Sequence, residues 1–160
     1  MQLNYLTFSL LTTLTSWLVG MALHYILRKS DSYNQAVFNL NFIRSKSANR
    51  LIGTGLFKWI VKNTFFKYLN QKLNLKASSD KEDLHKLRAE MTNSEIEHLI
   101  GFAFVSVFAV IKIIQGHYLL ALIMTMVNTL LNMYPSLLQQ ENKRRIDLFL
   151  NRMKESSKLS

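Results

Sequence analysis

The stretch TNSEIEHLIGFAFVSVFAVIKIIQGHYLLALIMTMVNTLLNMYPSLLQQENKRR, from Thr92 to Arg145, decides the fold of this chain. It contains two apolar runs joined by the short turn Gln115–His117. Each run is long enough to cross the roughly 30 Å hydrocarbon core of a bilayer. Polar residues lie at the ends of both runs that are far from the turn. The stretch therefore predicts a transmembrane helical hairpin with a polar cluster at one membrane face.

A third apolar block, Leu3–Leu27, contains no Asp, Glu, Lys or Arg and is also long enough to span. A secretory signal peptide fits this block poorly, because no Lys or Arg precedes it, it is too long, and no small-x-small cleavage site follows. Small or polar residues recur along it at helical spacing, which favours close packing between helices in lipid. We expect this face to pack on the hairpin; its members are Ser9, Thr13, Ser16, Gly20 and His24.

Composition and charge bound the class of protein. A chain of 160 residues is one domain at most. It has no cysteine, which excludes disulfides and thiolate chemistry. A net charge of +10 often indicates nucleic-acid binding, but segregated basic loops explain it here by topology, and we predict no nucleic-acid partner. We predict a single all-α integral membrane domain over residues 1–160, with spans at about 4–27, 95–115 and 117–138.

The segment between the first two spans, about residues 28–94, carries thirteen of the twenty basic residues. Within it, Leu51–Leu75 mixes aromatic and aliphatic residues with lysines that share roughly one side of a helix. This pattern predicts an amphipathic helix that lies in the membrane interface. The alternative is a soluble helix packed on a small cytoplasmic core. A break is expected at Ala77–Asp80, followed by a short polar helix over Lys81–Met91.

The second span is expected to begin at Thr92-Asn93-Ser94, where Thr92 or Ser94 has capping-box spacing to Glu95 or Glu97. The third span is expected to end near Leu138, one turn after Pro135, and a short polar tail follows. The basic residues lie between spans one and two and after span three, apart from Lys112. The positive-inside rule then places the N-terminus outside and both the central segment and the C-terminus in the cytoplasm.

This topology brings polar residues of all three spans to the cytoplasmic level. Ionisable and polar groups at membrane depth are costly, and they are usually partnered or functional. The predicted cluster comprises His24, Glu90, Glu95, His98, Asn128, Asn132, Tyr134, Gln139, Asn142 and Arg145.

Glu95 and His98 are three residues apart and therefore neighbours on one helical face. A carboxylate beside an imidazole can raise its basicity and orient it, as a general base for an alcohol requires. The basic run Lys143–Arg145 could hold a phosphate-rich group.

Structural explanations remain open for each of these residues. Glu95 and Glu97 suit the first turn of a helix, and His98 could be an interfacial histidine. The asparagines could join helices, and Lys143–Arg145 could be a stop-transfer cluster. Glu90, Glu95 and His98 also carry metal-ligand types, but no second Glu-x-x-His motif is present, and we predict no metal.

The hairpin resembles the glycosyl-diaponeurosporenoate acyltransferase family of small bacterial membrane proteins. That family's pattern has a Glu, a further Glu-x-x-His at the start of an apolar span, then Asn-x-Tyr-Pro, a Gln and an Asn-Arg-x-Arg-like stretch. Phe66-Lys67 stands where the family often has Trp-Lys, Gln140-Glu141 replaces a basic–aromatic pair, and Lys143 replaces an arginine. The matching positions here are Glu90, Glu95, His98, Asn132, Tyr134, Pro135, Gln139, Asn142 and Arg145.

The resemblance implies an O-acyltransferase of carotenoid or glycolipid biosynthesis in the bacterial inner membrane. It would transfer a fatty acyl group to a hydroxyl of a lipid-linked glycoside at the cytoplasmic face, with acyl-CoA or another thioester as co-substrate and no cofactor. Glu90, Glu95 and His98 would be catalytic. The substrate-binding residues would be His24, Asn132, Tyr134, Gln139, Asn142 and Arg145.

Two non-catalytic functions compete with this one. The chain could be a small helical subunit of a membrane complex or a homo-oligomer, whose polar residues bind neighbours or lipid headgroups. It could also be a sensor whose basic central segment binds a cytoplasmic anion. All three functions involve membrane lipids, and only the enzyme requires a glycolipid substrate.

Overall fold

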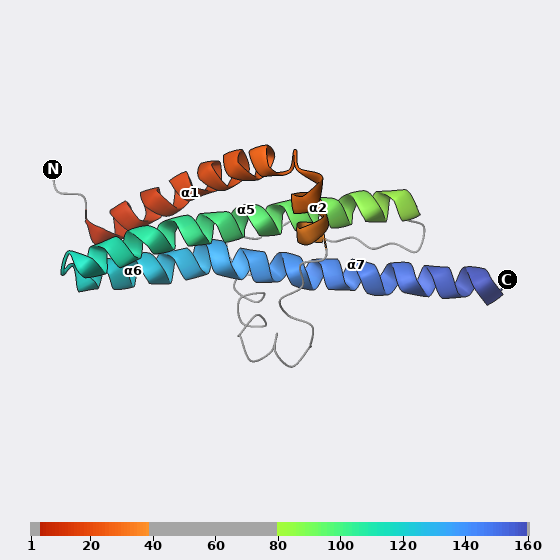
Figure 1. The fold of residues 1–160 in the computed structure, drawn as a ribbon. Coiled ribbons are helices and arrows are strands. Elements are labelled where there is room, and N and C mark those ends of the chain that lie inside the picture. Colours follow the sequence, from red (N-terminus) through yellow and green to blue (C-terminus); the bar gives the residue numbers. More distant parts are fainter. Residues whose placement is uncertain (1–3, 39–79, 160) are drawn as a thin grey trace. The chain divides into compact units, whose positions relative to one another are not determined.

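The computed structural model of the chain describes residues 4–38 and 80–159, and every element in these residues is a helix (Figure 1). The all-α prediction is confirmed. The predicted interfacial helix Leu51–Leu75 lies outside the described residues. The elements are α1 (Tyr5–Leu27), α2 (Asp31–Phe38), α5 (Lys81–Ile114), α6 (Tyr118–Asn128), the π-helix η2 (Thr129–Met133) and α7 (Tyr134–Leu159).

Three helical stretches are long and apolar enough to cross a membrane, as predicted: Tyr5–Leu27, Lys81–Ile114 and Tyr118–Ser157. Only 22%, 22% and 33% of their most apolar windows are buried inside the protein. Most of their apolar surface therefore faces outward, as expected for helices surrounded by lipid rather than by water. The chain is a membrane protein.

The chain forms two compact units. Unit 1 comprises Met1–Asn39 and Asn93–Ser136, and unit 2 comprises Leu40–Thr92 and Leu137–Ser160. The prediction of a single domain stays a prediction.

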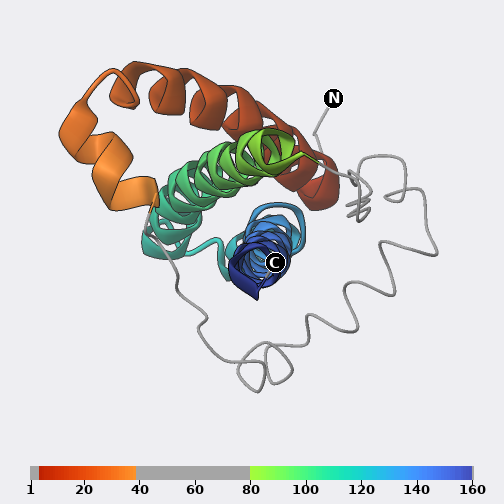
Figure 2. The same cartoon turned by 90° about the vertical axis from the view of Figure 1, so that its right-hand side faces the viewer.

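In unit 1, α1 begins after Asn4, whose side-chain oxygen accepts a hydrogen bond of 2.7 Å from the backbone N–H of Thr7. α1 packs against α6. A sharp bend after Leu27 leads into α2 (Figure 2). The buried residues of α1 confirm the predicted packing face; they are Ser9, Thr13, Ser16, Gly20 and His24.

Gly20 allows α1 to approach α5 very closely. A Cβ atom at this position would overlap the backbone carbonyl oxygen of Glu97 and would lie 3.1 Å from its carbonyl carbon. Because both obstructing atoms belong to the backbone, no side-chain rotation could make room. Gly20 therefore sets the separation of these two helices in unit 1.

The predicted start of a helix at Thr92-Asn93-Ser94 is wrong, because α5 runs without a break from Lys81 to Ile114. The side chains that resembled a cap bond elsewhere. The Thr92 hydroxyl donates to the carbonyl of Arg88, one turn back, at 3.0 Å. Asn93 Oδ1 lies 3.2 Å from His24 Nε2. Thr and Asn are tolerated inside a helix when their side chains find such partners.

The predicted end of the third span near Leu138 does not end the helix, since α7 continues to Leu159. A proline inside an α-helix lacks the N–H and its ring clashes with the carbonyl four residues earlier. Directly before Pro135 the helix widens into η2, and the N–H of Tyr134 bonds to the carbonyl of Thr129, five residues back. This wider turn accommodates Pro135 without a break.

The turn between α5 and α6 is tight (Figure 1). It contains Gly116 at φ +80°, a backbone conformation that favours glycine. Near this turn unit 1 has a small apolar cluster of Val105, Ala109 and Met124. Unit 2 has its own apolar core, where Leu84 and Met91 of α5 pack with Ile146 of α7.

Candidate active site

The π-helix η2 places Asn132, which is fully buried, at the centre of a hydrogen-bond network in unit 1. Its amide nitrogen lies 3.1 Å from Ser16 Oγ of α1 and 2.8 Å from Asn128 Oδ1 of α6. Its amide oxygen lies 3.0 Å from the indole Nε1 of Trp17 and 3.4 Å from Nδ1 of His98. One side chain thus joins residues of α1, α5 and α6.

The donor and the acceptor of the hydrogen bonds in this network follow from two contacts that allow only one direction. Asn128 Nδ2 must donate to the carbonyl of Phe102, at 3.0 Å, since a carbonyl can only accept. Asn128 Oδ1 is then the acceptor for the amide nitrogen of Asn132. At the other end, the indole N–H of Trp17 can only donate, which requires the oxygen of Asn132. The two ends agree on the orientation of the Asn132 amide.

This orientation determines the tautomer of His98. Because Asn132 Oδ1 is an acceptor, Nδ1 of His98 must carry the proton and donate it. In the neutral ring, Nε2 then has the lone pair that can accept a proton. Within residues 4–38 and 80–159, Nε2 has no hydrogen-bond partner. The His98 ring is thus oriented with Nε2 available to a ligand.

His98 lines a pocket of about 170 Å³ in unit 1. The pocket has two apolar residues from α1, Trp17 and Met21, and two polar residues from α5, Glu97 and His98. The rings of Trp17 and His98 meet edge to face, with centroids 6.0 Å apart and planes at 89°. The pocket is therefore a place where a substrate group can reach the imidazole.

Glu95, the predicted partner of His98, is fully buried on α5 in unit 1. The hydrogen-bond partner of His98 Nδ1 is Asn132, which belongs to the Asn-x-Tyr-Pro part of the family pattern. Asn132 is therefore the residue that contacts Nδ1 of His98, and the orienting and catalytic roles of Glu95 stay predictions. The neighbouring Glu97 is the acidic residue on the pocket wall.

His24 is buried and belongs to a separate polar group in unit 1. Its Nδ1 lies 2.9 Å from the hydroxyl of Tyr33 in α2, and its Nε2 lies 3.2 Å from Asn93 Oδ1. With the oxygen of Asn93 as acceptor, Nε2 donates and Nδ1 accepts from the Tyr33 hydroxyl. Both ring nitrogens are engaged, so His24 joins α1, α2 and α5.

Tyr33 lies outside the membrane-spanning helices and keeps its proton. Burial, and secondly the negative charge of Glu97, raise the pKa of the Tyr33 phenol above its ordinary value. Both causes disfavour the phenolate. Tyr33 is therefore a neutral hydroxyl at physiological pH, consistent with its role as the donor to His24.

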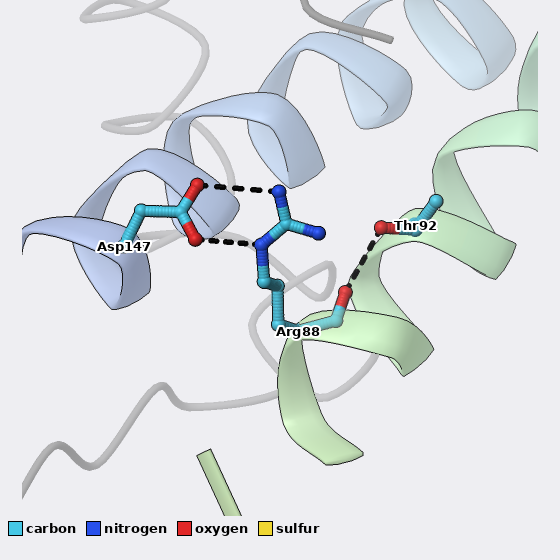
Figure 3. Close-up of polar contacts among 3 residues, drawn as sticks. All are labelled: Arg88, Thr92 and Asp147. Carbon is cyan, nitrogen blue, oxygen red and sulfur yellow. Dashed lines mark hydrogen bonds and ion pairs between the residues drawn. The ribbon is translucent and has the colours of Figure 1, made fainter. Parts of the chain in front are cut away.

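Four predicted site residues lie in unit 2, namely Glu90, Gln139, Asn142 and Arg145, whereas Tyr134 lies in unit 1. In unit 2, Arg88 on α5 forms an ion pair with Asp147 on α7 (Figure 3). Nε of Arg88 lies 2.6 Å from Oδ1 of Asp147, and Nη2 lies 3.4 Å from Oδ2. This pair joins the two helices beside the core of Leu84, Met91 and Ile146.

The predicted residues of unit 2 differ in their accessibility. Glu90 and Arg145 are exposed. Asn142 is buried, and its amide nitrogen makes long contacts with the sulfur of Met91, at 3.9 Å, and with Oε1 of Gln139, at 3.4 Å. Asn142 and Gln139 thus lie together, whereas Glu90 and Arg145 are available to ligands.

The basic run Lys143–Arg145 is not a uniform charged patch. Lys143 is buried, and Arg144 forms an ion pair of 2.8 Å with Glu141. Arg145 is therefore the exposed member of the run.

The sequence reasoning missed Trp17 and Tyr33 as site residues. Each has a polar group on a large ring, and such groups usually find a hydrogen-bond partner when buried. Trp17 follows Ser16 of the small-residue face directly, so its place near that face was a usable signal. Among the described residues, no group of three or more His, Cys, Asp or Glu is placed to hold a metal ion.

Residues 29–152 match the family described as glycosyl-4,4'-diaponeurosporenoate acyltransferase. No match was found among curated proteins or among solved structures. The match covers most of the chain and includes Glu95, His98 and Asn132, although it leaves out α1. The chain belongs to the glycosyl-4,4'-diaponeurosporenoate acyltransferase family.

Proposed function

We propose that this protein transfers a fatty acyl group from a thioester, such as acyl-CoA, to a hydroxyl of a lipid-linked glycoside. The observation that carries the proposal is the contact between Nδ1 of His98 and Oδ1 of Asn132, which lie 3.4 Å apart. The Phe102 carbonyl and the Trp17 indole orient the Asn132 amide so that its oxygen faces Nδ1 of His98. This arrangement favours the proton on Nδ1 and leaves Nε2 as a base at the pocket. The family membership supports the acyltransferase chemistry.

In the proposed reaction His98 acts as a general base and then as a general acid. Nε2 removes the proton of the acceptor hydroxyl while its oxygen attacks the thioester carbonyl carbon. A C–O bond forms, and the tetrahedral intermediate collapses as the C–S bond breaks. The proton passes from Nε2 to the leaving thiolate. The products are an ester and a free thiol, and no covalent acyl-enzyme is required.

Asn132 is a positioning residue in this proposal. Both of its N–H groups are already engaged, with Ser16 and Asn128, so it has none to offer a developing oxyanion. Its oxygen holds the His98 ring. Tyr134, half-buried at the end of η2, remains the candidate for stabilising the oxyanion.

We propose a separate part for unit 2 in binding the anionic end of the donor. Arg145 is exposed, and a guanidinium binds phosphate oxygens through paired hydrogen bonds. Gln139 and Asn142 would support this end of the donor, and Glu90 and Glu95 would assist the reaction. We expect Arg145→Ala to raise the KM for acyl-CoA more than it lowers kcat.

The proposed setting is the bacterial inner membrane, with the N-terminus outside and the C-terminus in the cytoplasm. The distribution of basic residues supports this orientation. An acyl-CoA donor also requires a cytoplasmic site, because CoA thioesters are made and kept in the cytoplasm. Cysteine-scanning with an impermeant thiol reagent would test the orientation, since the natural chain has no cysteine.

The test of the proposed function is a lipid and pigment profile of cells with the protein, without it, and with His98→Ala. We expect an acylated glycolipid to disappear in the deletion and in His98→Ala, because removing a general base costs roughly 10²- to 10⁴-fold in rate. His85→Ala is the matched control, since His85 is exposed on the same helix. It should keep the wild-type profile.

The same profile can contradict the proposal. If the deletion leaves the lipids unchanged, or if His98→Ala equals the wild type, the catalytic function is wrong. Stoichiometric co-purification of partner proteins would then favour a subunit of a membrane complex. Binding of an anionic cytoplasmic ligand without any change in lipids would favour a sensor.

A further inference from the structure

Glu97 lines the pocket beside His98, and His24 and Arg28 act on its carboxylate electrostatically. Within the two described stretches, 4–38 and 80–159, Glu97 makes no hydrogen bond and no ion pair. A carboxylate inside a membrane helix is costly unless a donor satisfies it. A ligand that carries a hydroxyl group would supply that donor.

We propose that Glu97 determines acceptor specificity by binding a second hydroxyl of the acceptor, next to the hydroxyl that His98 deprotonates. This inference rests on the proposed function. Glu97 and His98 are consecutive residues, and both line the same pocket. One hydroxyl donates to Nε2 of His98 and its neighbour donates to the Glu97 carboxylate. A sugar ring offers adjacent hydroxyls, whereas a simple alcohol offers one.

The opposite wall of the pocket suits the apolar face of a sugar ring. Trp17 and Met21 lie one turn apart on α1 and give the pocket an apolar side. The indole is held in place by its hydrogen bond to Asn132. The volume of about 170 Å³ is below the roughly 300–1,000 Å³ of pockets for drug-sized ligands, so the pocket fits a single ring.

The close approach at Gly20 fixes this wall. Gly20 lies between Trp17 and Met21 in α1 and touches the backbone of Glu97 itself. The distance from the apolar wall to the carboxylate therefore depends on a contact between backbones. Because the family match begins at residue 29, the residues of α1 that shape this subsite lie outside it.

A binding experiment tests the subsite without relying on catalysis. Trp17 and Trp59 are the two tryptophans of the chain, so Trp59→Phe leaves Trp17 as the single fluorescent reporter. The full chain in lipid nanodiscs would be titrated with octyl glucoside, below its micelle concentration, and with n-octanol. The two probes share the alkyl chain and differ in the sugar.

We expect octyl glucoside to change Trp17 emission saturably and to bind more tightly than n-octanol. Glu97→Ala should weaken glucoside binding about tenfold to a hundredfold, the effect of losing a hydrogen bond to a charged group. Glu97→Gln keeps an acceptor oxygen and the side-chain shape, so it should weaken binding less. Octanol binding should stay the same in all variants.

The control Glu82→Ala removes an exposed carboxylate from the same helix and should leave both affinities unchanged. Equal affinity for the two probes in the wild type, or unchanged glucoside affinity in Glu97→Ala, would overturn the subsite. Failure of the proposed function has a different signature. Glucoside binding that depends on Glu97, without acyl transfer to any acceptor, would retain the subsite and contradict the enzyme.

Discussion

The buried face of α1 in unit 1 and the α5–α7 interface of unit 2 bury opposite kinds of side chain. Every buried residue of α1 is small or polar, and most of its large apolar side chains are exposed. In unit 2, Leu84, Met91 and Ile146 are buried, and charged residues such as Glu82, Lys86 and Glu90 are exposed. The α1 face is thus polar where it is buried and apolar where it is exposed, whereas the α5–α7 core of unit 2 is apolar where it is buried and has charged residues on the exposed side.

This difference in buried residues indicates whether lipid or water surrounds each interface. Lipid tails are as apolar as leucine, so burying leucine between helices in a membrane gains little. Close backbone contact and hydrogen bonds hold such helices instead. In water the burial of apolar surface is the main favourable term. The pattern of the α1 face therefore fits a membrane interior, and that of the α5–α7 core fits an aqueous region.

The largest expected effect comes from cutting the apolar core of unit 2. Ile146→Ala should lower the free energy of unfolding by about 2–5 kcal/mol, because the side chain is 0% exposed and leaves a cavity. Leu122→Ala on α6 is the control in unit 1, where the side chain is half exposed. It should change stability by less than about 0.5 kcal/mol.

Unfolding in lipid micelles measures both variants. A large loss of stability for Leu122→Ala would show that this exposed face of α6 contributes to folding as a buried core does. The contrast between the two units would then be wrong.

The next effect tests backbone contact in unit 1. Gly20→Ala should cost about 1–3 kcal/mol or more, because the added methyl group meets the backbone of Glu97 and α1 must move away. Gly116→Ala meets nothing within 4 Å, and only its φ of +80° resists substitution, at about 1–2 kcal/mol. Gly20→Ala should also shift Trp17 emission, whereas Gly116→Ala should not.

Equal effects on Trp17 emission would show that Gly20 does not control the helix separation. If Gly20→Ala transfers acyl groups at the wild-type rate, the close packing of α1 on α5 is not needed for catalysis.

The sequence predicts the features of unit 1 that depend on solvent and repeat along one helix. The three apolar spans and the face from Ser9 to His24 follow from length and helical spacing alone, and both are confirmed. The pairing of His98 with Asn132 could not be predicted from spacing, because these residues are 34 positions apart and meet only through tertiary packing.

The mistaken helix start at Thr92 and the uninterrupted helix at Pro135 both concern local signals that tertiary structure overrides. Thr92 and Asn93 have the chemistry of a helix cap, but their side chains bond to Arg88 and His24, so α5 continues. Pro135 normally ends a helix, but the π-turn directly before it removes the clash. A cap or a proline read from sequence is a local preference, and the energies of packing exceed it.

A smaller effect tests the charges of unit 2. The Arg88–Asp147 ion pair has side chains that are 12% and 36% exposed, so its coupling energy should be about 0.5–1 kcal/mol. A double-mutant cycle with Arg88→Met and Asp147→Asn isolates this energy from other contacts of Arg88. The coupling should fall as salt is raised, because water reaches the pair.

The pair Lys86–Glu82, which is 64% and 74% exposed, is the matched comparison and should couple more weakly. A coupling of Arg88 with Asp147 that is large and insensitive to salt would indicate that lipid or protein shields this part of unit 2 from water.

The smallest effect concerns Tyr33 in unit 1. Burial and the charge of Glu97 raise the pKa of this phenol, so it should ionise above the ordinary value of about 10. The unfolded chain loses this proton first, so the folded state's advantage is fully present below pH 10 and is lost as the pH rises through the raised pKa.

Absorbance titration of the wild type minus Tyr33→Phe measures the pKa of Tyr33 directly. Glu97→Gln should lower it only in part, because burial is the larger cause and the substitution removes only the charge. Return of the pKa to its ordinary value in Glu97→Gln would mean that charge, not burial, dominates around α2. An unshifted pKa in the wild type would mean that water reaches this hydroxyl, and the hydrogen bond from Tyr33 to His24 would then be too weak to hold α2 on α1.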